Sequence, residues 1–130
     1  VDAELSDLVK QLAESITGRA RVPVSVEVVG HCDLPEEVKV AFYRIAQESL
    51  NNVAKHAGAT QAAVHLHCEP GQLRLSICDD GSGFSAKGIS PDSLGLGIMR
   101  ERAEAIGAEL TIESEVGQGT EVNVSWSPTT

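Results

Sequence analysis

Two short segments in which apolar and polar residues alternate, AAVHLHC at residues 62–68 and LRLSICD at 73–79, constrain the fold of this chain most. Such alternation is typical of strands with one buried face. The intervening EPGQ predicts a tight connection and therefore a β-hairpin. A second alternating pair, ELTIES and TEVNVSW, flanks EVGQG and predicts another hairpin. A fifth strand is predicted where valines alternate in VPVSVEVVG, residues 22–30.

Apolar residues at helical spacing predict a helix in each of three further segments. The expected helices cover residues 2–16, 33–57 and 96–106, and each is followed by a glycine that can end it, at positions 18, 58 and 107. The elements come in the order helix, strand, helix, two strands, helix, two strands. This order predicts an α+β fold, a two-layer sandwich with a mixed sheet and helices on one face.

The charge of the chain excludes some classes of partner. A length of 130 residues suits one domain, and the formal net charge of −9 repels nucleic acid, anionic membranes and a second copy of the chain. We therefore expect the isolated domain to be monomeric. The same charge repels a phosphate ligand, which would need local cations, helix N-termini or a metal ion.

The three cysteines, at positions 32, 68 and 78, lack the close pairs of a zinc site. We expect reduced thiols and a cytoplasmic location. No run of 18 apolar residues and no signal peptide is present in the sequence. Because the sequence begins with Val1 and not with Met, we expect residues 1–130 to be one domain of a longer protein, whose other parts could anchor it in a membrane.

The segment DDGSGF at residues 79–84 ends the second predicted hairpin strand with two acids, and glycines follow. One interpretation is a turn, since glycine tolerates positive φ and aspartate bonds its neighbouring backbone. The other is a ligand site, in which a fixed carboxylate reads a ligand and glycines let that ligand approach the main chain. The hexapeptide alone does not decide. The loop over residues 80–95 is longer than most connections, which favours a lid or a binding segment.

Four polar residues, Arg44, Glu48, Asn52 and His56, recur every four positions along the longest predicted helix. They form either a solvated face or a binding surface. Asparagine is a poor residue inside a helix. The amide oxygen of Asn52 and the carboxylate of Glu48 are the oxygen ligands that Mg²⁺ accepts. Lys55 and His56, one turn further on, could hold anionic oxygens.

Two glycine pairs and one histidine pair complete the candidates. Gly95 and Gly97 stand where the long loop enters the third helix, and N–H groups at a helix start bind phosphate. The GQGT at 117–120 is most simply a hairpin turn. His65 and His67 share one strand face, but no third ligand is near, so we expect no metal there.

Three segments in fixed order resemble the N, G1 and G2 boxes of the GHKL ATPase superfamily, which includes sensor histidine kinases and DNA gyrase B. They are RIAQESLNNVAKHAGA, DDGSGF and GLGIMRERAEAIGAELTIESEVGQGT. The resemblance extends from about Leu5 to Trp126. The phrases RIAQESLNN and MRERAEAIGA are most similar to the nitrate/nitrite-sensor-type branch of two-component histidine kinases.

The resemblance implies the Bergerat ATP-binding fold, with ATP and Mg²⁺ as ligands. At the base, Asp79 would accept a hydrogen bond from the adenine amino group, and Thr120 would share an ordered water with it. Gly81 and Gly83 would line the base pocket. Residues 84–95 would form the ATP lid.

The resemblance also implies roles at the phosphates. Asn52 would ligate Mg²⁺, with Lys55 and His56 near the polyphosphate. Glu48 would be the general base or the acid that orients the nucleophile. Two backbone amides would face the phosphates, those of Gly95 and Gly97.

The implied function is that of a histidine kinase catalytic domain, which passes the γ-phosphoryl group of ATP to a histidine on a dimerisation domain of the same kinase. A response regulator would act downstream. We expect the chain not to phosphorylate itself, since no histidine lies on its first helix. Two alternatives stay open: a serine kinase of the anti-sigma-factor type, and a nucleotide-sensing module that moves its lid without turnover.

Overall fold

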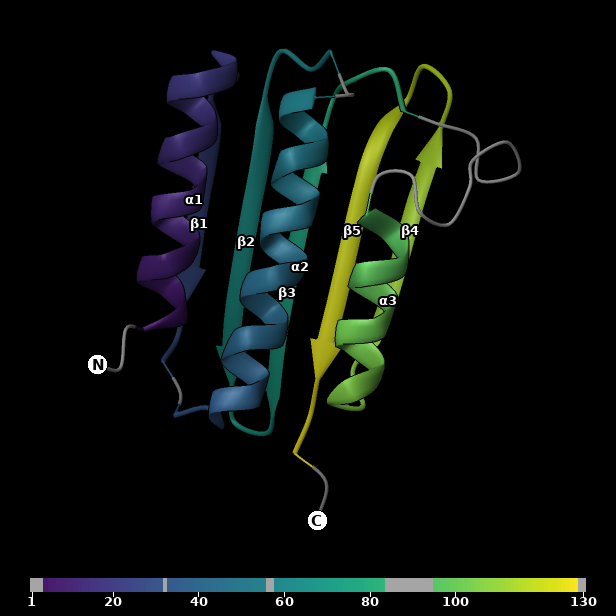
Figure 1. The fold of residues 1–130 in the computed structure, drawn as a ribbon. Helices are drawn as coiled ribbons and strands as arrows, with labels where there is room; N and C mark the ends of the chain where they lie inside the picture. The colour runs from purple at the N-terminus through teal and green to yellow at the C-terminus, as the bar shows by residue number, and fades with distance from the viewer. Residues whose placement is uncertain (1–3, 32, 56–57, 84–94, 129–130) are drawn as a thin grey trace.

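In the computed structural model, the described residues form three helices on one face of a five-stranded sheet (Figure 1). The structure describes residues 4–31, 33–55, 58–83 and 95–128. The helices are α1 (Leu5–Ala20), α2 (Glu36–Lys55) and α3 (Leu96–Ala105), and the strands are β1 (Val24–Val29), β2 (Ala62–Glu69), β3 (Gln72–Asp79), β4 (Glu109–Glu115) and β5 (Gly119–Trp126). The predicted α+β sandwich and its order of elements are confirmed. Within these residues, no helix combines the length and apolarity needed to cross a membrane.

The sheet is mixed, as predicted, with the strand order β1-β2-β3-β5-β4. β1 and β2 are parallel, since α2 carries the chain from one to the other, whereas the other neighbouring pairs are antiparallel. β3 therefore lies at the centre. At its last position, Asp79 pairs with Ala62 of β2 on one side and with Thr120 of β5 on the other.

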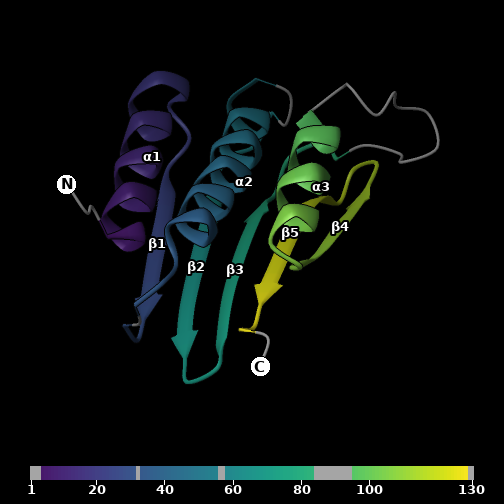
Figure 2. The same cartoon turned by 60° about the horizontal axis from the view of Figure 1, so that its bottom comes forward.

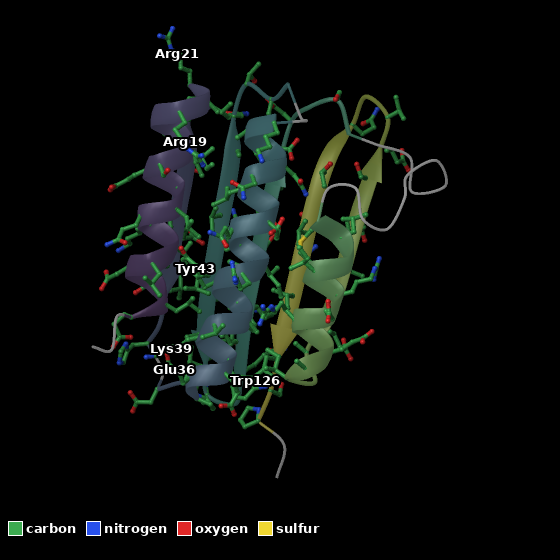
Figure 3. The ribbon with its side chains drawn as sticks, in the orientation of Figure 1. Arg19, Arg21, Glu36, Lys39, Tyr43 and Trp126 are labelled. Carbon is green, nitrogen blue, oxygen red and sulfur yellow. The ribbon has the colours of Figure 1, made fainter. Side chains whose placement is uncertain are left out.

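This topology gathers the ends of several helices and strands at one end of the sheet. α2 runs back to the start of β2, the hairpin returns β3 to the same end, and β4 turns there into β5. α3 leads to the far end, where β4 begins, so the N-terminal end of α3 lies toward the end of the sheet at which β3 finishes (Figure 1). Trp126, the last residue of β5, lies at the far end (Figure 3).

The core lies between the helical layer and the sheet, and Figure 2 shows all three helices on the same side. Alternate strand side chains such as Val64 and Leu75 are buried there. Because aromatic residues are only 3% of the chain, aliphatic side chains fill most of this space around Phe42. Between α2 and α3, the buried Ser49 hydroxyl donates to Met99 Sδ at 3.4 Å. This contact fixes α3 beside the polar row of α2.

α1 does not end at Gly18, as the sequence predicted. It continues to Ala20, and Arg21 follows in the left-handed region with φ 58° and its N–H bonded to the Thr17 carbonyl. Pro23 explains where the helix stops, since a proline disfavours helical backbone at the residue before it. The exposed Gly18 is tolerated inside the last turn.

The prediction of three reduced thiols is wrong for Cys68. This residue, near the end of β2, is disulfide-bonded, whereas Cys78 on β3 is a free thiol. Burial raises the pKa of the Cys78 thiol, and the nearby Glu121 carboxylate raises it further. Cys78 therefore packs as a small, uncharged side chain. Sequence spacing missed the bond because the fold, not the spacing, decides which sulfur atoms meet.

Candidate functional site

The two aspartates at the end of β3 have separate environments. Asp80 accepts hydrogen bonds at Oδ1 from the backbone N–H groups of Thr60 (2.8 Å) and Gln61 (3.1 Å). The Thr60 hydroxyl donates to its other oxygen. The Thr60 side chain and these N–H groups hold the pKa of Asp80 below its usual value. Asp80 therefore stabilises the connection between α2 and β2. Of the two interpretations of DDGSGF, the structural one, a turn stabilised by an aspartate, applies to this residue.

Asp79 is half-buried and is oriented by backbone. The Gly81 N–H donates to its Oδ1 at 2.8 Å. Burial raises the pKa of Asp79, and the Asp80 charge adds to this, while hydrogen bonds from the Gly81 and Thr120 backbones oppose it. Among the described residues that shift this pKa there is no cation. Within the described part of the chain, the carboxylate is thus held in place without an ion pair, and it can accept a further hydrogen bond.

The two glycine-containing segments that follow β3 and precede β5 pack on each other. The Gly117 N–H donates to the Ser82 carbonyl at 2.6 Å. A Cβ on Gly83 would collide with the Glu115 carbonyl, and one on Gly119 would collide with the Asp79 carbonyl. Glycine is therefore required at Gly83 and Gly119 for the main chains to approach this closely.

Thr120 is placed by its own neighbour as well as by the sheet. It lies opposite Asp79 in the register, and its hydroxyl is 2.8 Å from the Ser114 hydroxyl. Ser114 also donates to the Gly119 carbonyl at 3.1 Å. Sequence reasoning missed Ser114, since its link to Thr120 depends on the pairing of β4 with β5.

A hollow of about 370 Å³ opens beside Asp79 and Thr120. Three carboxylates also line it, at strand positions that face away from the helices: Glu113, Glu115 and Glu121. Their negative charge disfavours a polyphosphate there. The anionic end of a ligand held at Asp79 must therefore extend the other way, toward α2 and α3.

On the helical side, Glu48 of α2 lies against the start of α3. Gly95 caps α3 with φ 66°, and a Cβ there would collide with the Glu48 carboxylate. Gly97 is in the first turn of α3, whose leading N–H groups have no partner within the helix. A carboxylate is favoured at this positive helix end. The contact shows that the N-terminal end of α3 accommodates an anionic group.

The rest of the predicted polar row is only partly described. Asn52 is half-buried one turn after Glu48, whereas Arg44 is exposed and bonds the Gln47 side chain at 3.0 Å. Lys55 is exposed at the last position of α2. His56 and residues 84–94 of the expected lid lie outside the described residues.

The predicted residues thus fall into two groups at the same end of the molecule. Asp79, Gly81, Gly83 and Thr120 meet at the junction of β3 and β5, and Glu48 meets Gly95 between α2 and α3. Glu48 and Asn52 are half-buried on successive turns of α2, and their side-chain oxygens are of the kind that Mg²⁺ prefers as ligands.

Comparison with known proteins gives a consistent set of similarities. The family of histidine kinase-, DNA gyrase B- and HSP90-like ATPases matches residues 37–130. Sensor histidine kinase LiaS of Bacillus subtilis is 35% identical over 107 residues, which cover 82% of this chain and 30% of that protein. Sensor histidine kinase MctS of Rhizobium johnstonii is 37% identical over 121 residues, 89% of this chain and 26% of that protein. The chain spans less than a third of these curated relatives.

A solved structure extends the similarity to the fold. The histidine kinase domain of the blue-light activated histidine kinase EL346 from Erythrobacter litoralis superposes with a TM-score of 0.76 at 28% identity. The match covers 95% of this chain and 61% of that chain. The arrangement of helices and strands is therefore shared with a histidine kinase domain.

The junction between the two glycine segments can be tested without any ligand. Gly119→Ala should lower the free energy of unfolding more than Gly117→Ala. Both glycines have similar φ, 82° and 83°, so alanine strains both by about 1–2 kcal/mol. Only at Gly119 does the new Cβ meet the Asp79 carbonyl, while none of the described residues lies within 4 Å of such a Cβ at Gly117. Chemical denaturation measures both variants, and equal losses would contradict the contact.

Proposed function

The chain belongs to the family of histidine kinase-, DNA gyrase B- and HSP90-like ATPases, and from this membership we propose that it binds Mg-ATP and passes the γ-phosphoryl group to a histidine of a dimerisation domain. The observation that carries the proposal is the half-buried Asp79 carboxylate, held by the backbone of Gly81 and Thr120. An acceptor fixed in this way suits the amino group of adenine, which is a hydrogen-bond donor.

In this proposal, the base lies at the junction of β3 and β5. Asp79 accepts from the adenine amino group, and Thr120 shares an ordered water with it. Gly81 and Gly83 leave room for the purine, and Gly83 also lets the segment after β3 pack on the β4–β5 turn. The carboxylate must stay in one position to discriminate adenine, and its backbone bonds supply that rigidity.

The phosphates extend toward the start of α3 in the same proposal. The amides of Gly95 and Gly97 donate to phosphate oxygens, and Lys55 and His56 supply positive charge near the polyphosphate. Asn52 holds Mg²⁺, which neutralises phosphate charge when bound. Glu48 acts as general base or orients the attacking histidine. A phosphate near Gly95 would be repelled by the Glu48 carboxylate that lies there, so the positive charge of a cation held by Asn52 would be needed to offset this repulsion.

The finer parts of the proposal rest on the sequence. We place residues 1–130 as the catalytic domain of a longer, cytoplasmic or membrane-anchored kinase, with a response regulator as its downstream partner. RIAQESLNN and MRERAEAIGA support the nitrate/nitrite-sensor-type branch. The similarity to sensor histidine kinases favours this function over the serine kinase and the nucleotide-sensing module. We also propose that the isolated domain is monomeric and its lid closes over the nucleotide.

The role of Asp79 can be separated from that of its neighbour. Asp79→Asn should weaken Mg-ATP binding about 5–150-fold, because the amide sets a donor against the adenine donor and an unpaired buried group costs about 1–3 kcal/mol. Isothermal titration calorimetry on the isolated chain measures the affinity. Parent-like affinity in this variant would rule out adenine recognition by Asp79.

Asp80→Asn is the matched control. It removes the charge from a side chain that accepts hydrogen bonds from the N–H groups of Thr60 and Gln61. It should therefore lower the melting temperature while Mg-ATP affinity changes little. Because the pKa of Asp80 is lowered on folding, its stabilising effect is complete above its unfolded pKa and is lost as pH falls through its folded pKa. If both variants lost affinity equally, the distinction between the two aspartates would be wrong.

Phosphoryl transfer itself requires a supplied acceptor. With γ-labelled ATP, we expect acid-labile label on a separate dimerisation helix pair that carries a histidine, and none on the chain alone, because transfer needs the acceptor held in line with the γ-phosphate. Glu48→Gln should slow this labelling about 10²–10⁴-fold with binding nearly intact. Asn52→Ala should instead weaken nucleotide binding in a Mg²⁺-dependent way.

The outcomes distinguish the candidate functions. Binding of Mg-ATP with no label, whether the chain is alone or mixed with the helix pair, would favour the nucleotide-sensing module. Acid-stable label on a serine substrate would favour the serine kinase. Label on the lone chain would contradict the need for a second domain. If Glu48→Gln and Asn52→Ala showed the same defect in nucleotide binding and no change in the rate of labelling, the separate roles of Glu48 and Asn52 would be contradicted.

A further inference from the structure

A cluster of two histidines and a glutamate lies on the face of the sheet opposite the helices. His65 and His67 stand at alternate positions of β2. Val64 and Leu66, which alternate with them, are buried toward the helices, so the two imidazoles lie on the other face. Glu27 of β1 lies directly opposite His65 in the parallel register. From the sequence we expected no metal here for want of a third ligand, but the pairing of β1 with β2 supplies one.

The geometry of the cluster suits one ion. Glu27 Oε1 lies 3.3 Å from Nδ1 of His65 and 2.9 Å from Nε2 of His67. One ligand atom from each side chain lies within 4.8 Å of the other two. Ligands around a tetrahedral zinc ion, with bonds of about 2.0–2.2 Å, are separated by about 3.3–3.5 Å. Small side-chain rotations therefore bring all three atoms to bonding distance.

We propose that Glu27, His65 and His67 bind a divalent transition-metal ion such as Zn²⁺, at a site separate from the nucleotide site. Imidazole nitrogen favours zinc, copper and nickel over Mg²⁺, which prefers oxygen ligands. Three protein ligands leave at least one coordination position for water or for a group from outside the chain.

The surroundings of the cluster are compatible with a cation. Arg74 lies opposite His67 in the register, but its guanidinium is 3.1 Å from the Glu69 carboxylate and so is already paired. A groove of about 440 Å³ runs from the two histidines across the sheet, lined further by polar side chains that include Ser76 and Asn123. The side chains of His65 and His67 are 43% and 33% exposed, so an ion can reach them from solvent.

A bound ion would join two strands that are distant in sequence. β1 is an edge strand, and its pairing to β2 is the parallel one in the sheet. Because the ion binds the folded arrangement and the unfolded chain does not hold these three groups together, it should raise the melting temperature by mass action. This effect is independent of nucleotide, since the helices and the nucleotide site lie on the other face.

Calorimetric titration of the untagged, metal-free chain with Zn²⁺ tests the proposal, with Co²⁺ absorption as a second readout. We expect one ion per chain and a higher melting temperature. His67→Gln and His65→Gln should each weaken Zn²⁺ binding at least about tenfold, since loss even of a group that only supports a ligand costs about 10–100-fold. Glu27→Gln should weaken it as well, and Mg-ATP binding should be unchanged in all three.

His31→Gln is the matched control, because Nδ1 of His31 also faces a carboxylate, Glu4 Oε2 at 3.8 Å, but has no second histidine beside it among the described residues. Cys78→Ser controls for capture by the free thiol. Both controls should bind Zn²⁺ like the parent. Absence of saturable Zn²⁺ binding in the parent would overturn the proposal and leave the cluster as hydrogen bonds between imidazole and carboxylate. A loss in either control equal to that in His67→Gln would overturn it too.

Discussion

The hydrogen bonding of β3 on both sides is the constraint on which the rest of the site depends. Because β2 and β5 hold the strand to its last residue, Asp79 is fixed between Ala62 and Thr120. Two further contacts surround it: the Gly81 N–H donates to its carboxylate, and Gly119 of β5 lies so close to its carbonyl that a side chain there would collide. A carboxylate at a fraying strand end would not be held in one position.

At the same end of the molecule, the helical layer offers groups that can bind an anion. The parallel crossover through α2 brings its polar row beside the start of α3, and the Ser49–Met99 contact fixes the two helices together. Glu48 then touches Gly95 at the positive end of α3. The chain has a net charge of −9, so polyphosphate binding needs local positive charge. We propose that the start of α3, Lys55 and a metal held by Asn52 supply it.

The order of elements followed from periodicity, because each half-buried segment carries its own pattern. Local signals singled out the segment DDGSGF and the glycines at positions 95 and 97, but the role predicted for Asp79 came from the family resemblance, because the hexapeptide alone did not decide. The hydrogen bonds that hold Asp80 were not predictable, since they depend on Thr60 and Gln61, about twenty residues earlier in the sequence, lying beside it. The pairing of β1 with β2 likewise decided the approach of Glu27 to the two histidines.

A crystal structure of this chain with Mg²⁺ and a non-hydrolysable ATP analogue tests the central claim most directly. We expect the adenine amino group within hydrogen-bonding distance of the Asp79 carboxylate, Mg²⁺ bound by Asn52, and phosphate oxygens at the amides of Gly95 and Gly97. A base bound away from Asp79, or phosphates lying over Glu113 and Glu121 on the opposite face, would contradict it.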